Sequence, residues 1–269
     1  MRAFCASLLL VLFASACICQ QPQSSPENEQ TGNVTEIIRD GGVSQVLQSI
    51  YIPPIKGAPF TAIVHTEWIR PLPDGGTFTV VNQRQVARDS TGRIYEERWL
   101  LVPKDGKMPS QMNVIEIADP VAHTLDNCFT LRTPHRCLLE TLRESAMDAY
   151  RPSMGQTGPL PNGDGFRTHE DLGMQTFSGI DCQGTRDTTT INPGVFGNDR
   201  PFNRKREFWF AASLGIDLRS EITDPSFGKE VFTVTDVNTS EPDPKLFELP
   251  EGYAVVDQRR PAASNEQAR

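Results

Sequence analysis

The sequence predicts a mainly β protein, in which an antiparallel meander forms a curved sheet or an open half-barrel. First, segments rich in β-branched and aromatic residues recur between 60 and 237. Second, Gly, Pro, Asp and Asn cluster between these segments, as at 73–76 and 89–92. Third, the 21 Pro and 20 Gly of the 269 residues are scattered along the chain, which is typical of many tight turns.

A short N-terminal helix is predicted over 43–50. Its apolar residues, Leu47 among them, follow the i, i+3, i+4, i+7 spacing, and Pro53 ends the pattern. No other segment has clear helical periodicity. We therefore expect this helix to cover the concave face of the sheet and to leave an apolar cavity beneath it.

The predicted strands form two meanders. The first has strands at 60–68, 77–88, 93–102, 113–117, 124–128 and 136–142. The second has strands at 172–177, 181–191, 205–212, 216–223 and 230–237. Between them, 145–170 is rich in Gly and Pro and is predicted to be a long surface loop.

The N-terminus predicts export. One positive charge, an apolar run at 6–13 and small residues before Cys17 are typical of a secretory signal peptide at 1–16. Two readings of this junction stay open: cleavage by an ordinary signal peptidase, or a bacterial lipobox that leaves Cys17 lipidated and the protein anchored to a membrane. Either reading places the protein in the bacterial periplasm or outer envelope.

The domain organisation follows from composition. The polar residues at 17–41 predict a disordered tether, 42–256 a single β-rich domain, and 257–269 a disordered tail. The net charge of −8 gives no electrostatic basis for binding nucleic acid.

The cysteines of the domain predict one disulfide. Cys128 and Cys137 flank a predicted turn, so facing strands bring them together, and an oxidising compartment favours their pairing. The alternative is two buried free thiols. Cys182 is then unpaired and is expected to be a small buried apolar residue.

No catalytic motif stands out, and we expect no enzyme, metal or cofactor. The four histidines lack zinc-ligand spacing, and the sequence has no phosphate-binding loop and no nucleophile elbow. His169 lies in the densest polar group and supports the less favoured hypothesis of a secreted hydrolase. The basic run 200–206 is read as a charged guard on an edge strand, with binding of an anionic lipid or acidic partner as the alternative.

Most strand aromatics are expected to be core residues, and some to line a ligand cavity. The side chains predicted to line this cavity are Leu47, Trp68, Trp99, Trp209 and Phe210.

The second meander contains a recognisable sequence pattern. Segments 207–210, 214–218 and 220–228 repeat a strand with Trp, a turn, a strand and an Asp-Pro turn, and 232–237 and 241–250 follow. These segments resemble the lipoprotein-carrier and outer-membrane lipoprotein-sorting superfamily. Segments 86–98 and 119–124 resemble secreted bacterial proteins of unassigned activity. The resemblance implies a half-barrel.

The favoured hypothesis is therefore an exported, non-enzymatic envelope protein that binds an apolar ligand, a lipid or a lipoprotein partner. The alternative is a structural or interaction module that docks a membrane complex.

Overall fold

The computed structural model describes Leu47, 50–142 and 156–259. The chain divides into two compact units, 1–34 and 35–269, and every described residue belongs to the second. The signal peptide, Cys17 and the tether therefore lie outside the described residues. So does the predicted helix, apart from Leu47 and Ile50.

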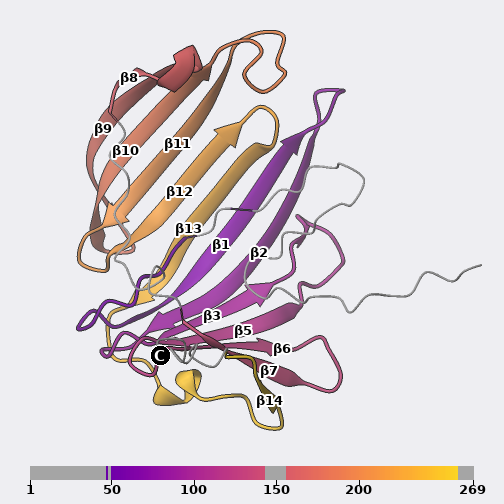
Figure 1. Ribbon diagram of the computed structural model, residues 1–269, viewed down its shortest axis with the longest axis vertical. Coiled ribbons are helices and arrows are strands. Elements are labelled where there is room, and N and C mark those ends of the chain that lie inside the picture. The colour runs from indigo at the N-terminus through magenta and orange to yellow at the C-terminus, as the bar shows by residue number, and fades with distance from the viewer. Residues whose placement is uncertain (1–46, 48–49, 143–155, 260–269) are drawn as a thin grey trace, which may run out of the picture. The chain divides into compact units, whose positions relative to one another are not determined.

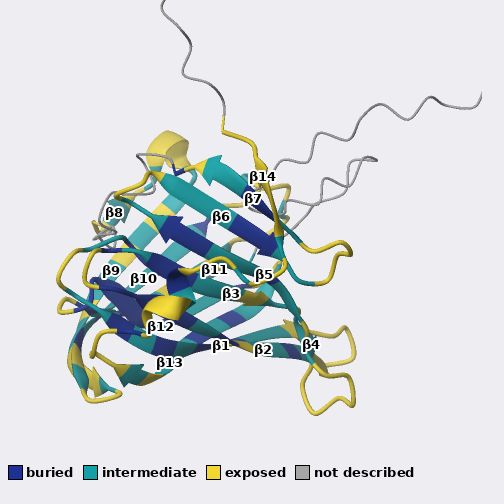
Figure 2. Ribbon diagram, turned by 90° about the horizontal axis from the view of Figure 1, so that it is seen from below, coloured by how far each residue is buried: buried dark blue, intermediate teal, exposed yellow. Residues whose placement is uncertain are grey.

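The described chain forms one 14-stranded sheet that curves without closing, which confirms the predicted fold class (Figures 1 and 2). Along the sheet the order is β14-β7-β6-β5-β3-β2-β1-β13-β12-β11-β10-β9-β8, with β4 beside β2. The strands are β1 (Phe60–Pro71), β2 (Thr77–Arg88), β3 (Ile94–Trp99), β4 (Val102–Pro103), β5 (Met112–Asp119), β6 (Thr124–Phe129), β7 (Arg136–Thr141), β8 (Gly158–Pro159), β9 (Gly165–Phe177), β10 (Ile180–Ile191), β11 (Phe202–Ala211), β12 (Ile216–Asp224), β13 (Gly228–Asn238) and β14 (Ala254–Asp257). Two short 3-10 helices, η2 (Pro161–Gly163) and η3 (Pro244–Phe247), accompany them.

The two meanders meet in the middle of the sheet, where β1 pairs antiparallel with β13. Every other neighbouring pair along the sheet comes from successive strands, except β3 with β5 and the parallel pair of β7 with β14. The first and the last long strands are thus hydrogen-bonded to each other. This pairing joins the two meanders into one sheet.

The main core lies on the face of β1 that carries Phe60, Ala62 and Val64. Val86 is on the same face of β2, because it is paired with Ala62, and Phe232 of β13 belongs to the same cluster. Residues that precede β1 also join this core. We call this side of β1 and β2, followed across paired residues, the core face.

Arg88 holds the chain before β1 against this core. Its guanidinium is fully buried and donates to the carbonyl oxygens of Pro53 at 2.8 Å, Ala58 at 2.8 and 2.9 Å, and Leu214 at 2.6 Å. Burial lowers the pKa of Arg88 to about 10, so the side chain stays charged at neutral pH. Three separate backbone segments therefore depend on one cation for their carbonyl hydrogen bonds.

A second, smaller core lies on the opposite face of the sheet. Val86 belongs to the main core, whereas its neighbour Ala87 packs with Tyr95 and Ile117 under Phe247 of η3. Consecutive strand residues point to opposite faces, which explains the two clusters. The Leu246–Phe247 segment thus covers this face of the sheet.

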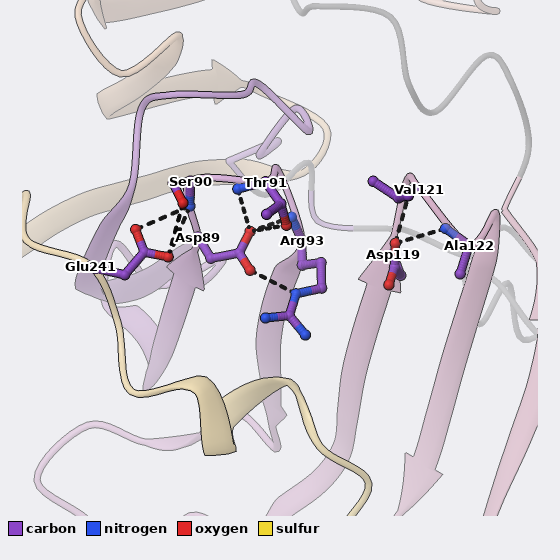
Figure 3. A network of polar contacts seen from close by, with 8 residues as sticks. All are labelled: Asp89, Ser90, Thr91, Arg93, Asp119, Val121, Ala122 and Glu241. Carbon is purple, nitrogen blue, oxygen red and sulfur yellow. Dashed lines mark hydrogen bonds and ion pairs between the residues drawn. The ribbon is translucent and has the colours of Figure 1, made fainter.

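The β2–β3 turn and the C-terminal segment are joined by a polar network (Figure 3). Asp89 accepts hydrogen bonds from the backbone of Thr91 at 3.0 Å and Arg93 at 2.8 Å, and pairs with Arg93 Nε at 2.6 Å. The Arg93 guanidinium lies 4.8 Å from the centre of the Phe247 ring, and Glu241 accepts from the Ser90 backbone at 3.2 Å. Asp89 lies in the turn predicted at 89–92, where its side chain satisfies two backbone N–H groups.

Two predictions about the second meander were wrong. The loop expected over 145–170 ends early, because β8 lies at 158–159 and β9 begins at Gly165, which pairs with Ile191. The basic run 200–206 does not guard an edge, because β11 is hydrogen-bonded to β10 on one side and β12 on the other. Polar residues concealed the first part of β9, and pairing on both sides makes β11 an interior strand.

Candidate ligand-binding face

Strand pairing aligns a transverse row of side chains across the sheet. Directly paired residues in neighbouring strands point to the same face, so a register defines such a row. Starting from Trp68 on the core face, the registers give one row over seven strands. We call it the Trp68 row, and it consists of Val80, Trp68, Glu230, Ile222, Arg206, Asp187 and His169.

Burial on the core face of β1 changes at Trp68. Phe60, Ala62, Val64 and Thr66 are all buried, whereas Trp68 is half-buried. The main core thus ends before the strand does. The last four residues of β1, next to the turn into β2, therefore extend beyond the core, by about 3.3 Å per residue.

On the β2 side, the neighbours of Trp68 are apolar. Phe78 lies on the same face of β2, one pair beyond Val80, and is 44% exposed. The Trp68 indole donates to the carbonyl oxygen of Phe227 at 3.0 Å, and the Arg70 guanidinium lies 5.1 Å from its ring centre. An aromatic surface is therefore held in place next to the core and partly open.

The other end of the row is charged. His169 Nδ1 lies 2.6 Å from Asp187 Oδ1, and the Arg206 guanidinium lies 5.8 Å from the Phe208 ring. The hydrogen bonds of the described residues put no serine or cysteine on the His169 ring. His169 therefore lacks the neighbouring nucleophile that the hydrolase hypothesis requires within the described part of the chain.

The five predicted cavity residues do not share one surface. Leu47 packs against the main core, to which Trp209 belongs. Trp209 donates to Glu207 at 2.9 Å and lies 5.3 Å from the Phe177 ring. Phe210 follows Trp209 directly in β11, so these two side chains point to opposite faces.

Trp99 is also separated from Trp68. It donates to Glu97 at 2.8 Å, and Tyr95 donates to the same carboxylate at 2.9 Å. These three residues alternate along β3 on the face of the smaller core, opposite to the core face. Of the predicted set, Trp68 alone lies in the row defined above, and a ligand role for any of the five stays a prediction.

The disulfide between Cys128 and Cys137 is present, as predicted. The two residues are direct partners in the β6–β7 hairpin. Cys182 is a buried free thiol, and burial, followed by the charges of Asp217 and Asp181, raises its pKa to about 11. It is thus a poor nucleophile at neutral pH, in agreement with the expectation that it is a small buried residue.

A partly buried charge cluster was not predicted from the sequence. Arg84 pairs with Glu96 at 2.7 Å, and Arg98 pairs with Glu116 at 2.7 Å, across β2, β3 and β5. Burial raises the pKa of Glu116 despite the neighbouring guanidinium of Arg98. The alternation of charged residues in β3 was visible, but only the register shows that Glu96 faces Glu116 on the neighbouring strand.

The described residues contain no group of three or more His, Cys, Asp or Glu that could hold a metal ion. Among them there is also no helix with the length and apolar character needed to cross a membrane.

No protein-family model and no curated protein matches the chain. Among solved structures, MucB of Pseudomonas aeruginosa in complex with MucA is 15% identical over 75% of this chain and 59% of MucB, with a TM-score of 0.37. Lipoprotein LppX of Mycobacterium tuberculosis is 14% identical over 69% of this chain and 90% of its own, with a TM-score of 0.32. A LolA superfamily protein of Nitrosomonas europaea is 12% identical over 72% and 92%, with a TM-score of 0.24.

The chain therefore spans less than two thirds of the length of MucB. The fold is an open half-barrel, visible in the curved, unclosed sheet itself.

Proposed function

We propose that this protein is an exported, non-enzymatic component of the bacterial envelope, whose half-barrel binds an apolar or amphiphilic ligand, such as a lipid or a lipoprotein partner. One observation carries the proposal: the core face continues past the core as an aromatic surface. Trp68 is half-buried there, and Phe78 is 44% exposed.

The energetics of such a site are favourable. Each buried methylene of an acyl chain contributes about 0.8 kcal/mol, so ten methylenes contribute roughly 8 kcal/mol before costs. The loss of translational and conformational freedom reduces this sum to an affinity in the micromolar range. An aromatic surface held by the Trp68–Phe227 hydrogen bond is already ordered, which limits the cost of binding.

An environment-sensitive fatty-acid probe tests the proposal. Phe78→Asp places a charge on the exposed apolar surface, and we expect it to weaken probe binding by at least tenfold. Phe166→Asp is the matched control, because Phe166 is 46% exposed and lies on β9, far from β2 in the strand order. It should leave probe binding within twofold of the unsubstituted protein.

If the folded protein shows no saturable probe binding at tens of micromolar, the ligand-binding function is wrong. A second candidate then takes its place: an interaction module that docks a membrane complex. The exposed apolar side chains of Leu72, Leu100 and Met108, which lie in connections outside the regular strands, favour that candidate.

A further inference from the structure

On β9, β10 and β11, the face that the registers connect to Trp68 carries a small grid of polar side chains. Arg206, Asp187 and His169 are paired in the Trp68 row, and Arg204, Thr189 and Arg167 form the adjacent row. Residues two apart in a strand share a face, so both rows lie on the same side of the sheet. Three guanidiniums thus gather over three neighbouring strands.

Most of the charges in this grid are paired with each other or with β12. Asp187 contacts His169 Nδ1 at 2.6 Å, and Arg204 Nε contacts the Asp224 carboxylate. Arg167 differs from both. Its Nε is buried and has no hydrogen-bond partner among the described residues.

A buried donor without an acceptor costs about 1–3 kcal/mol, unless a ligand supplies the acceptor. A guanidinium matches the geometry of a phosphate or carboxylate, to which it donates two parallel hydrogen bonds. The neighbouring guanidiniums of Arg204 and Arg206 add positive potential on the same face. An oxyanion would therefore supply the hydrogen-bond acceptor that Arg167 Nε does not have among the described residues.

We propose that Arg167, together with Arg206, binds the anionic head group of an amphiphile, a phosphate or carboxylate, whose apolar chain lies toward Trp68. This inference rests on the proposed function. Three strand spacings, about 14 Å along the sheet, separate β1 from β11, which carries Arg206, and five spacings, about 24 Å, separate β1 from β9, which carries Arg167. The shorter span suits one acyl chain that starts beside Arg206 and ends on the aromatic surface.

Calorimetric titration of the full exported chain with three probes tests this proposal: dodecyl phosphate, the uncharged dodecyl maltoside below its micellar concentration, and inorganic phosphate. We expect dodecyl phosphate to bind at least tenfold more tightly than dodecyl maltoside. Arg167→Gln should remove this preference and leave the binding of dodecyl maltoside unchanged. Arg206→Gln, at an exposed position, should weaken dodecyl phosphate in the same direction and provides a second variant if Arg167→Gln does not fold.

Lys205→Gln is the matched control. Lys205 lies between Arg204 and Arg206 and is exposed on the opposite face of β11, so it removes the same charge from the other side of the sheet. It should change none of the three affinities by more than twofold.

The outcomes separate the two proposals. If both amphiphiles bind equally and Arg167→Gln changes neither, the head-group site is wrong while the apolar site stands. If inorganic phosphate alone binds, and Arg167→Gln abolishes this binding, the oxyanion site stands without the amphiphile and the proposed function fails. If no probe binds, both proposals are wrong.

Discussion

The indole of Trp209 lies directly over Gly184, its cross-strand partner in β10. A Cβ atom added to Gly184 would lie 2.5 Å from Cζ3 of the Trp209 ring, closer than two non-bonded carbon atoms can approach. The absence of a side chain at Gly184 is therefore what lets Trp209 lie flat in the main core. This contact connects β10 to the aromatic pair of Trp209 and Phe177.

The first prediction follows from that contact. Gly184→Ala should destabilise the fold by about 1–3 kcal/mol, because the ring must move or the core must expand. Chemical denaturation followed by tryptophan fluorescence measures the loss. Gly158→Ala is the control, since a Cβ there meets no atom within 4 Å. Equal stability of the two variants would show that the Trp209 ring does not rest on Gly184.

The second prediction concerns the Cys128–Cys137 disulfide, which closes a loop with a sequence separation of 9. Removing it by Cys128→Ser with Cys137→Ser should cost about 2–3 kcal/mol and lower the melting temperature by several degrees. Thiol labelling of the unfolded, unreduced protein should detect Cys182 and miss the other two. Labelling of all three without reductant would contradict the pairing.

The third prediction concerns Asp89 and pH. Burial raises the pKa of Asp89, but hydrogen bonds from Thr91 and Arg93 outweigh burial and hold the pKa below its ordinary value. The ionised carboxylate therefore stabilises the fold above about pH 4, and this stabilisation disappears as the pH falls through the lowered pKa. Asp89→Asn should cost about 1–3 kcal/mol at pH 7.

Denaturation of Asp89→Asn and the unsubstituted protein at pH 7 and pH 3 checks this prediction, and the difference between them should shrink at the lower pH. The exposed turn residue Asp74 accepts one hydrogen bond, from Gly76 at 2.9 Å, and Asp74→Asn should change stability by less than about 0.5 kcal/mol. If Asp89→Asn lowers the free energy of unfolding equally at both pH values, the charge of Asp89 does not contribute to stability.

The fourth prediction concerns Phe247, which packs on the smaller core and under Arg93. Phe247→Ala should cost about 3 kcal/mol through the cavity that it leaves. It should also release the segment 241–257, which limited proteolysis detects as early cleavage there. Leu249→Ala, at a residue that is 40% exposed, should leave both stability and cleavage nearly unchanged. Slow cleavage in both variants would contradict an anchoring role for Phe247.

The fifth prediction separates the two readings of the N-terminus. If Cys17 is lipidated, Cys17→Ser should move the exported protein from the detergent phase to the aqueous phase in a phase-separation assay. Cys182→Ser is the control and should not alter the distribution. An aqueous distribution for every form would exclude the lipid anchor and leave export itself intact.

The sequence predicted the local structure well. Alternating segments identified most long strands, and the turn predicted at 89–92 is present, with a hydrogen bond from Thr91 to Asp89. The Cys128–Cys137 pair followed from its hairpin, because both partners are close in sequence. These features depend on interactions within a few residues, and single-sequence patterns encode such interactions.

The candidate site was predicted less well, because it depends on which strands are neighbours. Arg167, Asp187 and Arg206 come from three strands, and the register that places them on one face is fixed by pairing over the whole second meander. Two register shifts, one between Gly184 and Thr185 and one between Trp209 and Phe210, also lie in this region. Each shift offsets one strand against its neighbour, so alternation in a single strand does not predict which side chains share a face.

The pairing of β1 with β13 has a consequence for the order in which the protein folds. Residues such as Thr66 and Phe232 meet across more than half of the chain, so the middle of the sheet is completed only when the last long strand has been synthesised. Until then the first meander exposes the edge of β1, a template for pairing with other chains. Contacts this distant in sequence form slowly. A chaperone that shields the β1 edge in the interval should therefore raise the yield of folded protein more than one that binds the C-terminal segment.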